Sequence, residues 1–201
     1  MTRIISGAAQ GALLRVPPRG TRPTSDRVRE AIFSALEARG AIDGADALDL
    51  YAGSGALGLE AISRGAASVT LVENNQRAAA LIRSNASAVT KAMLGRGAEG
   101  LDAPRIRVEA LSATRFLEGE AREQVDLVFI DPPYDLRGDE LTRVLGLLAP
   151  RVKPWATVVL ERSSRDPVPQ IPAPLVLERT KTYGETAIHT LALDDADEDG
   201  R

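Results

Sequence analysis

Apolar runs alternate with amphipathic segments along most of the chain from about residue 46 onward. Short apolar runs predict buried strands, and apolar residues spaced at the helical period predict helices. The predicted strands are residues 45–51, 68–73, 105–111, 125–131 and 156–162. The predicted helices are residues 58–64, 76–93 and 139–148. Because strands that alternate with helices build βαβ units, this pattern predicts a mostly parallel sheet.

The carboxy-terminal part of the chain has a different pattern. Two β-rich runs within residues 175–193 flank Tyr183-Gly184-Glu185, which is typical of a tight turn between antiparallel strands. The fold expected is therefore a Rossmann-like α/β fold. Its mostly parallel seven-stranded sheet would end in an antiparallel hairpin.

Residues 1–40 are predicted to form a small N-terminal extension of the same domain. Residues 3–7 and 13–17 would pair as a short hairpin, and Thr24 or Ser25 would cap a helix with one apolar face. Arg22, Arg27 and Arg29 would lie away from that apolar face. We expect a single domain over residues 1–193 and an acidic, disordered tail over residues 194–201.

The net charge of −3 is distributed unevenly. The tail carries −4, which leaves residues 1–193 at +1. Six arginines stand against two carboxylates in the first thirty residues: Arg3, Arg15, Arg19, Arg22, Arg27 and Arg29. A basic segment on a nearly neutral body is typical of a phosphate-contacting surface, although an ordinary solvated surface explains it about as well.

Composition narrows the class of protein further. With 201 residues and 44% hydrophobic content, the chain can bury a sizeable core. It has no run of signal-peptide length and no stretch near the roughly 18 apolar residues of a membrane span, so we expect a cytoplasmic protein. The sequence gives no sign of its oligomeric state, and a monomer is the simplest expectation. The absence of cysteine excludes disulfides and cysteine nucleophiles. The sole histidine, His189, lies in the predicted hairpin, where we expect a structural role, and no spacing suggests a metal site.

A glycine-rich turn joins the first predicted strand to the helix that follows. The turn is Gly53-Ser54-Gly55-Ala56-Leu57-Gly58, and Glu73 ends the next strand. Glycines let the backbone approach a ligand closely, and a carboxylate at the second strand end can accept hydrogen bonds from both ribose hydroxyls. NAD and S-adenosylmethionine both carry that ribose. The turn alone therefore leaves a dehydrogenase and a methyltransferase open.

Asp49 favours the methyl donor. It lies four residues before Gly53, where a carboxylate would hold the ligand's ammonium group, directly or through water, and would repel a pyrophosphate. The alternative for Asp49 is a turn-capping role. We assign Tyr51, Gly53, Ser54, Gly55, Glu73 and Asn74 to the same cofactor site.

The sequence Asp131-Pro132-Pro133-Tyr134 follows the fourth predicted strand, at the sheet edge where ligands bind in α/β folds. An exocyclic amine on a base is a poor nucleophile because its lone pair is delocalised into the ring. Asp131 and the Pro132 carbonyl would accept hydrogen bonds from the N–H groups of this amine and turn its lone pair toward a methyl group. The two prolines fix the backbone, and Tyr134 offers a ring for stacking on an extruded base. A rigid structural turn is the alternative.

Taken together, these residues resemble those of the bacterial family that methylates the N2 amino group of a guanine in 16S ribosomal RNA. The matching blocks are Arg3–Gly7, Arg22–Glu30, Leu48–Gly58, Asp131–Tyr134 and Lys181–Thr186. The second block discriminates, because the Asp131–Tyr134 tetrad also occurs in adenine-N6 and cytosine-N4 enzymes that act on DNA. The resemblance spans nearly the whole chain.

The resemblance implies a class I methyltransferase that uses S-adenosylmethionine and makes N2-methylguanine. It implies a 16S rRNA substrate within an assembling 30S subunit. It also implies RNA contacts from the N-terminal segment, for which we name Arg3, Arg22, Thr24, Arg27 and Arg29.

One position departs from the family pattern. Such enzymes commonly carry an aspartate after the third strand to hold the adenine amino group, whereas this chain has Ser112-Ala113. We expect a backbone or serine oxygen at Ser112 or Ala113 to accept that bond. Residues 94–104 are Gly-rich and receive no role.

The nearest alternative is a DNA amino-methyltransferase with the same catalytic tetrad, but no extra domain for reading a duplex is apparent. A cytosine-C5 methyltransferase needs a thiolate, which this chain cannot supply. A nicotinamide-dependent dehydrogenase would leave Asp131–Tyr134 without a purpose, and a non-enzymatic RNA-binding protein would need neither motif.

Overall fold

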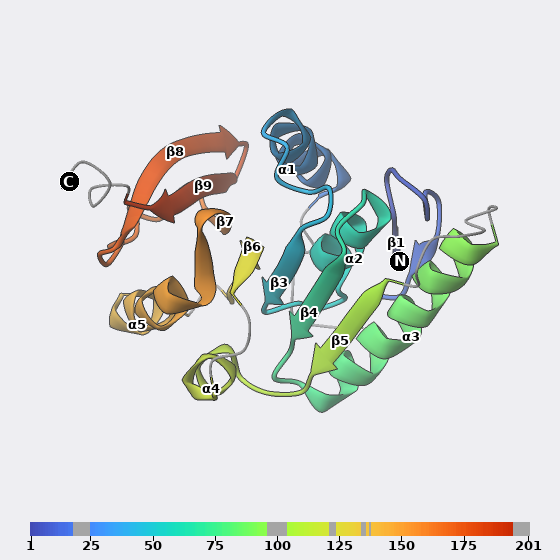
Figure 1. The fold of residues 1–201 in the computed structure, drawn as a ribbon. Coiled ribbons are helices and arrows are strands. Elements are labelled where there is room, and N and C mark those ends of the chain that lie inside the picture. The colour runs from blue at the N-terminus through green and yellow to red at the C-terminus, as the bar shows by residue number, and fades with distance from the viewer. Residues whose placement is uncertain (18–24, 96–103, 121–123, 134–135, 137, 195–201) are drawn as a thin grey trace.

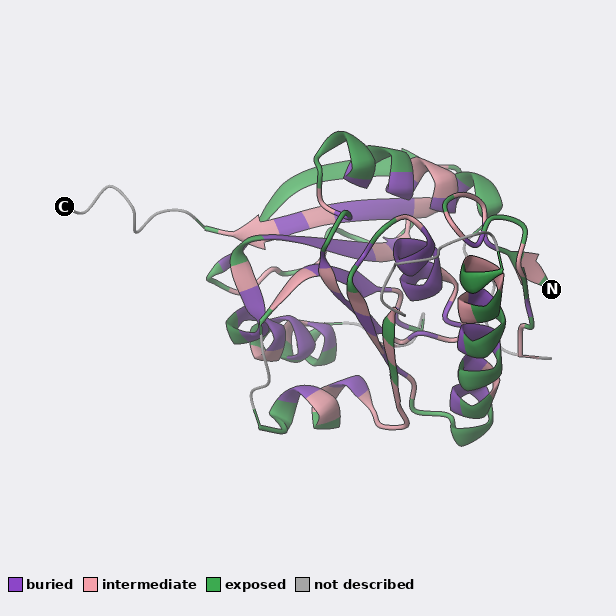
Figure 2. Cartoon of the chain, turned by 45° about the vertical axis from the view of Figure 1, so that its right-hand side comes forward, coloured by how far each residue is buried: buried purple, intermediate pink, exposed green. Residues whose placement is uncertain are grey.

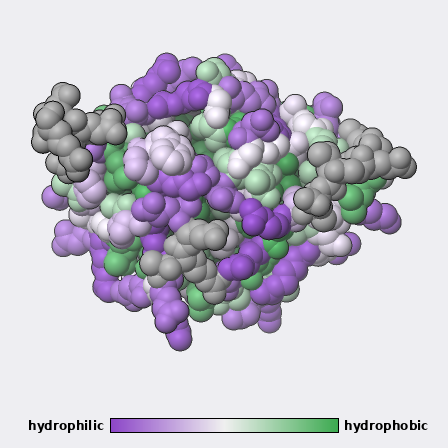
Figure 3. Space-filling view, in the orientation of Figure 1, coloured by the Kyte–Doolittle hydropathy of each residue, from purple (hydrophilic) through white to green (hydrophobic). Residues whose placement is uncertain are grey.

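The computed structural model describes residues 1–17, 25–95, 104–120, 124–133, 136 and 138–194 (Figure 1). Arg22, Thr24, Tyr134 and the predicted tail from residue 195 onward lie outside these ranges. Within them, no helix is both long and apolar enough to cross a membrane. The face shown in Figure 3 is largely hydrophilic, with hydrophobic side chains in small groups between the polar ones.

The predicted seven-stranded sheet is confirmed. Its strands are β3 (Asp46–Leu50), β4 (Ser68–Val72), β5 (Arg105–Glu109), β6 (Val125–Ile130), β7 (Val152–Ser163), β8 (Leu175–Tyr183) and β9 (Thr186–Leu193). They are ordered β5-β4-β3-β6-β7-β9-β8. The first five pair in parallel, and β9 runs antiparallel to both β7 and β8. The sheet is thus parallel up to β7 and closes with the predicted hairpin.

Strand β7 begins earlier than the apolar pattern predicted. Its pairing with β6 starts at Val152 opposite Val125 and then shifts, so that Thr157 lies opposite Leu127. The intervening residues bulge out of the ladder and include Pro154, which has no N–H to donate. Because of the bulge, the first part of the strand shows neither an alternating pattern nor an apolar run, so the sequence did not predict it.

The terminal hairpin turns at Gly184-Glu185, since Tyr183 pairs directly with Thr186. Gly184 has a φ of +60°, the left-handed conformation that a two-residue turn favours. His189 is buried and its Nδ1 lies 2.9 Å from Thr180 Oγ1. Burial, helped by the charge of Arg162, lowers the pKa of His189. The histidine therefore joins the two strands inside the hairpin, as expected of a structural residue.

Helices cover both faces of the sheet (Figures 1 and 2). One face carries α1 (Asp26–Ala38), α2 (Ala56–Ser63) and α3 (Gln76–Leu94), and the other carries α4 (Ala113–Glu118), α5 (Asp139–Leu148) and the 3-10 turn η1 (Ala149–Arg151). Alternate residues of β6 serve the two cores: Phe129 packs against Phe33 of α1, with ring centroids 5.5 Å apart, and Val128 faces α5. Helix α4 was not predicted, because its six residues are too few to show a period.

The N-terminal segment is part of the core rather than a loose arm. Strands β1 (Thr2–Arg3) and β2 (Leu13–Leu14) pair antiparallel, so the predicted hairpin is confirmed in a shorter form. Ile4 and Leu14 are fully buried in the α1–α3 side of the core. Gly7 lies so close to α2 that an added Cβ would be 1.9 Å from the Ser63 carbonyl oxygen. Only glycine fits this contact.

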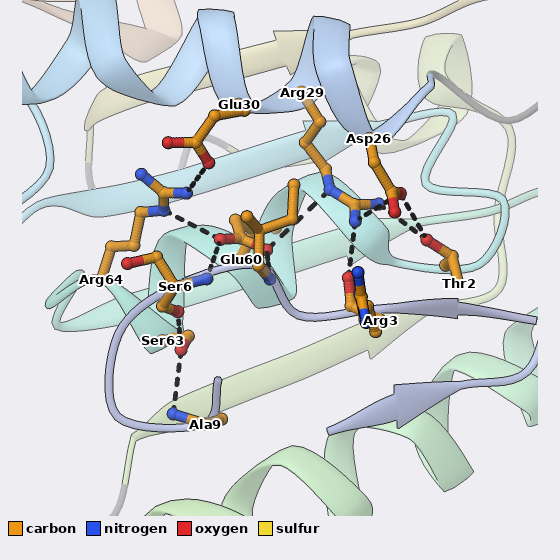
Figure 4. A network of polar contacts seen from close by, with 12 residues as sticks. Thr2, Arg3, Ser6, Ala9, Asp26, Arg29, Glu30, Glu60, Ser63 and Arg64 are labelled. Atoms are coloured by element: carbon orange, nitrogen blue, oxygen red, sulfur yellow. Dashed lines mark hydrogen bonds and ion pairs between the residues drawn. The ribbon is translucent and has the colours of Figure 1, made fainter. Parts of the chain in front are cut away.

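A buried carboxylate, Glu60 of α2, ties this segment to the helices (Figure 4). Its oxygens accept hydrogen bonds from the backbone N–H groups of Ile5 (2.8 Å) and Ser6 (3.0 Å) and from Nε of Arg64 (2.8 Å). Arg64 also pairs with Glu30 and Glu37 of α1. One carboxylate therefore connects the N-terminal segment and α2, and through Arg64 it reaches α1.

The prediction that Arg29 lies away from the core and contacts RNA is wrong. Arg29 is 0% exposed, its guanidinium donates to the Arg3 carbonyl and to Asp26, and its Nε lies 3.9 Å from the Glu60 carboxylate. Thr2 Oγ1, the Arg3 carbonyl and Asp26 accept hydrogen bonds from the guanidinium, and the nearby charge of Glu60 offsets part of the cost of burying it. Arg29 is thus a structural residue.

Replacing Glu60 by glutamine is expected to lower the free energy of unfolding by about 3 kcal/mol, because the buried ion pair with Arg64 loses its carboxylate and the Ile5 and Ser6 N–H groups lose one of their two acceptor oxygens. Urea unfolding at pH 7 measures the change. Arg105→Gln is the matched control: its pair with Asp46 is exposed and should cost less than about 1 kcal/mol. Equal losses in the two variants would show that the Glu60 network contributes no more than a surface ion pair.

Candidate active site

Three predicted site segments meet at one edge of the sheet because of strand register. Leu50 at the end of β3 pairs with Val72 at the end of β4 and with Ile130 at the end of β6. The segments that follow these strands therefore start side by side. They are the glycine turn from residue 51, the segment from residue 73, and the loop from residue 131, which the sequence predicts to be catalytic and which we call the catalytic loop.

The glycine turn has an unusual backbone that the end of β4 supports. Tyr51 has a φ of +67°, which is strained for a residue with a side chain, and Gly53 and Gly55 have φ of +57° and +77°. Glu73 accepts hydrogen bonds from Gly53 N at 2.9 Å and from Asn75 N at 2.7 Å. A Cβ on Gly55 would lie 3.2 Å from the Ile82 side chain. The turn is held in a shape that glycine makes possible.

Asp49 lies beneath this turn and is 1% exposed. Its Oδ2 accepts a hydrogen bond from Gly58 N, at 2.9 Å, in the first turn of α2. Burial raises the pKa of Asp49 to about 7, the Gly58 bond opposes that rise, and the charge of Glu73 adds to it. The contact matches the capping role considered from the sequence. The proposed hold on a ligand ammonium stays a prediction.

Tyr51 connects the glycine turn to the helix that follows the catalytic loop. Its side chain packs against the core on the α5 side of the sheet. Burial raises the pKa of the Tyr51 phenol to about 12, and the charge of Glu140 in the first turn of α5 adds to the effect. The sequence indicated Tyr51 from its place in the turn but gave no reason to connect it with Glu140.

The catalytic loop begins directly at the end of β6. Asp131 is partly buried, Pro132 is buried and Pro133 is exposed. The Pro133 carbonyl accepts a hydrogen bond from Leu136 N at 3.0 Å. The two prolines restrict the backbone at the start of the loop, beside the glycine turn.

Ser112 lies farther along the same edge, after β5. It is the N-cap of α4, and its Oγ accepts a hydrogen bond from Arg115 N at 3.3 Å. Ala113 is buried. The cap explains why a serine suits this position, and adenine recognition by Ser112 or Ala113 stays a prediction. Asn74, on the neighbouring segment, is exposed.

A further residue of this site was not found from the sequence. Asn85 of α3 is 2% exposed, and its Nδ2 donates a hydrogen bond to the Ser54 carbonyl in the glycine turn at 2.9 Å. It lies on the buried side of α3 with Ile82 and Val89. A polar residue on an apolar helix face was the signal that could have found it, because such a residue needs partners.

Of the predicted RNA-contacting residues in the described ranges, Arg3 and Arg27 are exposed. Arg15, which belongs to the same basic segment, is exposed as well. Across the residues that the structure describes, no three histidine or carboxylate side chains are grouped so as to hold a metal ion.

Comparison with known proteins identifies the family. A family model described as conserved hypothetical protein 95 matches residues 2–192. The chain belongs to this family. One relative, Ribosomal RNA small subunit methyltransferase D of Escherichia coli K12, is 36% identical over 188 residues, which cover 92% of this chain and 86% of the relative. The resemblance inferred from the sequence blocks is thereby confirmed.

Solved structures agree with the fold of this family member. Hypothetical protein TTHA0928 of Thermus thermophilus superposes with a TM-score of 0.75 at 32% identity, covering 96% of this chain and 100% of that one. The rRNA methyltransferase aviRa of Streptomyces viridochromogenes has a TM-score of 0.70 at 18% identity, covering 96% and 94%, and shares the fold. The predicted Rossmann-like methyltransferase fold is confirmed.

Asp49 makes the stability of this family member depend on pH. Its pKa is about 7 in the folded chain against 3.8 for an ordinary aspartate. Between those pH values the folded state keeps a proton that the unfolded state has lost, so stability falls as pH rises. Asp49→Asn cannot ionise and keeps an acceptor for Gly58 N. Its Tm should therefore exceed that of the native chain by several degrees at pH 8 and by little at pH 4, at about 2–4 °C per kcal/mol.

Thermal unfolding at the two pH values measures this difference. Asp43→Asn, which alters an exposed aspartate ahead of β3, should leave the Tm nearly unchanged at both. A gain for Asp49→Asn that is the same at pH 4 and pH 8 would show that Asp49 ionises normally.

Proposed function

We propose that this protein transfers the methyl group of S-adenosylmethionine to the exocyclic N2 amino group of a guanine in 16S rRNA of the 30S subunit. The observation that carries the proposal is the meeting of two segments at one sheet edge. The Asp131-Pro132-Pro133 corner starts beside the glycine turn because Ile130 and Leu50 are paired in register. The name of the Escherichia coli relative supports the ribosomal substrate.

The residues of the glycine turn fit S-adenosylmethionine. Gly53 is left-handed and, among the described residues, a Cβ there would have only the Tyr51 carbonyl oxygen within 4 Å, so a ligand can approach the backbone of the turn at this position. Glu73 is partly exposed, and each of its oxygens accepts one backbone bond and has capacity for another. Glu73 would accept the ribose hydroxyls, and Asp49 would balance the ligand's ammonium. When bound, the cofactor supplies an electrophilic methyl group on a sulfonium.

The catalytic loop would act on the guanine amine. Asp131 and the Pro132 carbonyl would accept hydrogen bonds from the two N–H groups of the amine. These bonds make the nitrogen more pyramidal and direct its lone pair toward the methyl group. Consecutive prolines hold both acceptors in place. Tyr134 stacks on the extruded base, a contact worth roughly 1–3 kcal/mol. The methylated nitrogen is cationic and releases its proton readily, so the site needs no strong base.

RNA binding in this proposal uses the exposed part of the basic N-terminal segment. Arg3 and Arg27 are exposed, and Arg22 and Thr24 belong to the same segment. Arg29 is excluded because it is buried against Glu60. Phosphate contacts of this kind predict affinity that falls with added salt.

Methyl transfer from radiolabelled S-adenosylmethionine tests the substrate. The acceptors are 30S subunits, free 16S rRNA, duplex DNA and no nucleic acid, with mass analysis of the labelled nucleoside. N2-methylguanosine from a ribosomal acceptor is the expected product. Label in DNA would favour an adenine-N6 or cytosine-N4 enzyme instead, and the absence of label with every acceptor would contradict the proposal.

Asp131→Ala tests the catalytic loop. The variant should bind S-adenosylhomocysteine with a Kd close to that of the native chain, because the glycine turn is intact. Its kcat should fall by about 100-fold or more, since a group that orients the nucleophile is lost. Calorimetric titration and the methyl-transfer assay measure the two quantities. Asp43→Ala removes an exposed carboxylate at the other end of β3 and should keep the native kcat; a native kcat for Asp131→Ala would remove Asp131 from the mechanism.

A further inference from the structure

Asn85 joins two segments that are far apart in the sequence. Its Nδ2 donates to the Ser54 carbonyl and to the Arg15 carbonyl, each at 2.9 Å, and its Oδ1 accepts from Arg15 N at 2.9 Å. Ser54 belongs to the glycine turn. Arg15 directly follows β2 in the N-terminal segment. A single buried side chain therefore bridges the candidate cofactor turn and the basic N-terminal segment at the exposed Arg15.

The bridge is specific to an amide side chain. Both Nδ2 hydrogens and Oδ1 are used, and the paired bonds to Arg15 reproduce the way one strand pairs with another. An apolar residue would leave one N–H and two carbonyls without this partner, which is costly for buried groups. A carboxylate would supply no donor for the two carbonyls. The residue type therefore follows from the contacts it makes.

Within the part of the chain that the structure describes, the other side-chain attachments of the N-terminal segment reach α1 and α2 rather than the glycine turn, and Arg29 of α1 donates to the Arg3 carbonyl. Ile5 and Ser6 donate to Glu60, and Ala9 N donates to Ser63 Oγ at 2.9 Å. These groups fix the beginning of the segment on the body of the helix. Among the hydrogen bonds of the described residues, those of Asn85 connect the segment directly to residue 54.

We propose that Asn85 is a positioning residue that couples the two substrates, so that cofactor in the glycine turn strengthens binding of ribosomal RNA by the N-terminal segment. The identity of both ligands rests on the proposed function. A ligand bound against the turn holds the Ser54 carbonyl, and through the Asn85 amide it holds the backbone that carries the exposed Arg15 side chain. An arginine that is already positioned costs less to engage with an RNA phosphate. By linkage, RNA strengthens cofactor binding by the same factor.

The test measures the Kd of the protein for 30S subunits by co-sedimentation, with and without saturating S-adenosylhomocysteine. For the native chain, S-adenosylhomocysteine should tighten binding by about 5-fold or more, within the usual range of coupling between sites. In Asn85→Leu the ratio should fall to near one. Asn85→Ser, whose side chain is too short to bridge both segments, should give the same result and serves if the leucine variant does not fold.

Val89→Ala is the matched control. Val89 is a buried residue one turn farther along α3 and contacts the core, so its truncation destabilises the same helix without touching the bridge. It should keep the native ratio. The proposal is overturned if the native ratio is already one, if the Asn85 variants keep the native ratio, or if Val89→Ala loses it equally. Failure of the native chain to bind either ligand alone would instead overturn the proposed function.

Discussion

The candidate site depends on the in-register parallel pairing of β3 with its two neighbours. β3 is hydrogen-bonded to β4 on one side and to β6 on the other, with Leu50 opposite both Val72 and Ile130. A shift of one residue on either side would turn the inward side chains of a strand to the opposite face of the sheet. Because those faces pack against different helices, the register is strongly fixed. The same register sets the spacing between the glycine turn and the catalytic loop.

Much of this arrangement could be predicted because it is local. Each parallel strand contains an apolar run, and the residues that follow each strand can be read directly from the sequence. Strand polarity then brings these residues to one edge, as α/β folds require. The sequence alone therefore predicted that the catalytic loop and the glycine turn lie at the same edge of the sheet.

The parts that could not be predicted depend on partners distant in sequence. Arg29 looks like a surface arginine at the border of an apolar helix face, and only the position of Glu60 shows that it points inward. Asn85 is one polar residue in a long helix until Arg15 and Ser54 are placed around it. The early start of β7 was hidden by a bulge, and α4 by its length. For Arg29 and Asn85 the deciding contact joins separate elements.

The burial of the N-terminal segment also determines which variants of such a protein can fold. Ile4 and Leu14 contribute to the main core, and the backbone of Ile5 and Ser6 satisfies a carboxylate that has no access to water. Removing the segment would therefore expose part of the main core and leave Glu60 without two of its donors, in addition to removing the basic residues. The basic N-terminal segment is therefore not a detachable module: it belongs to the same folding unit as the sheet and helices, and substitutions rather than truncations are the means of testing its role.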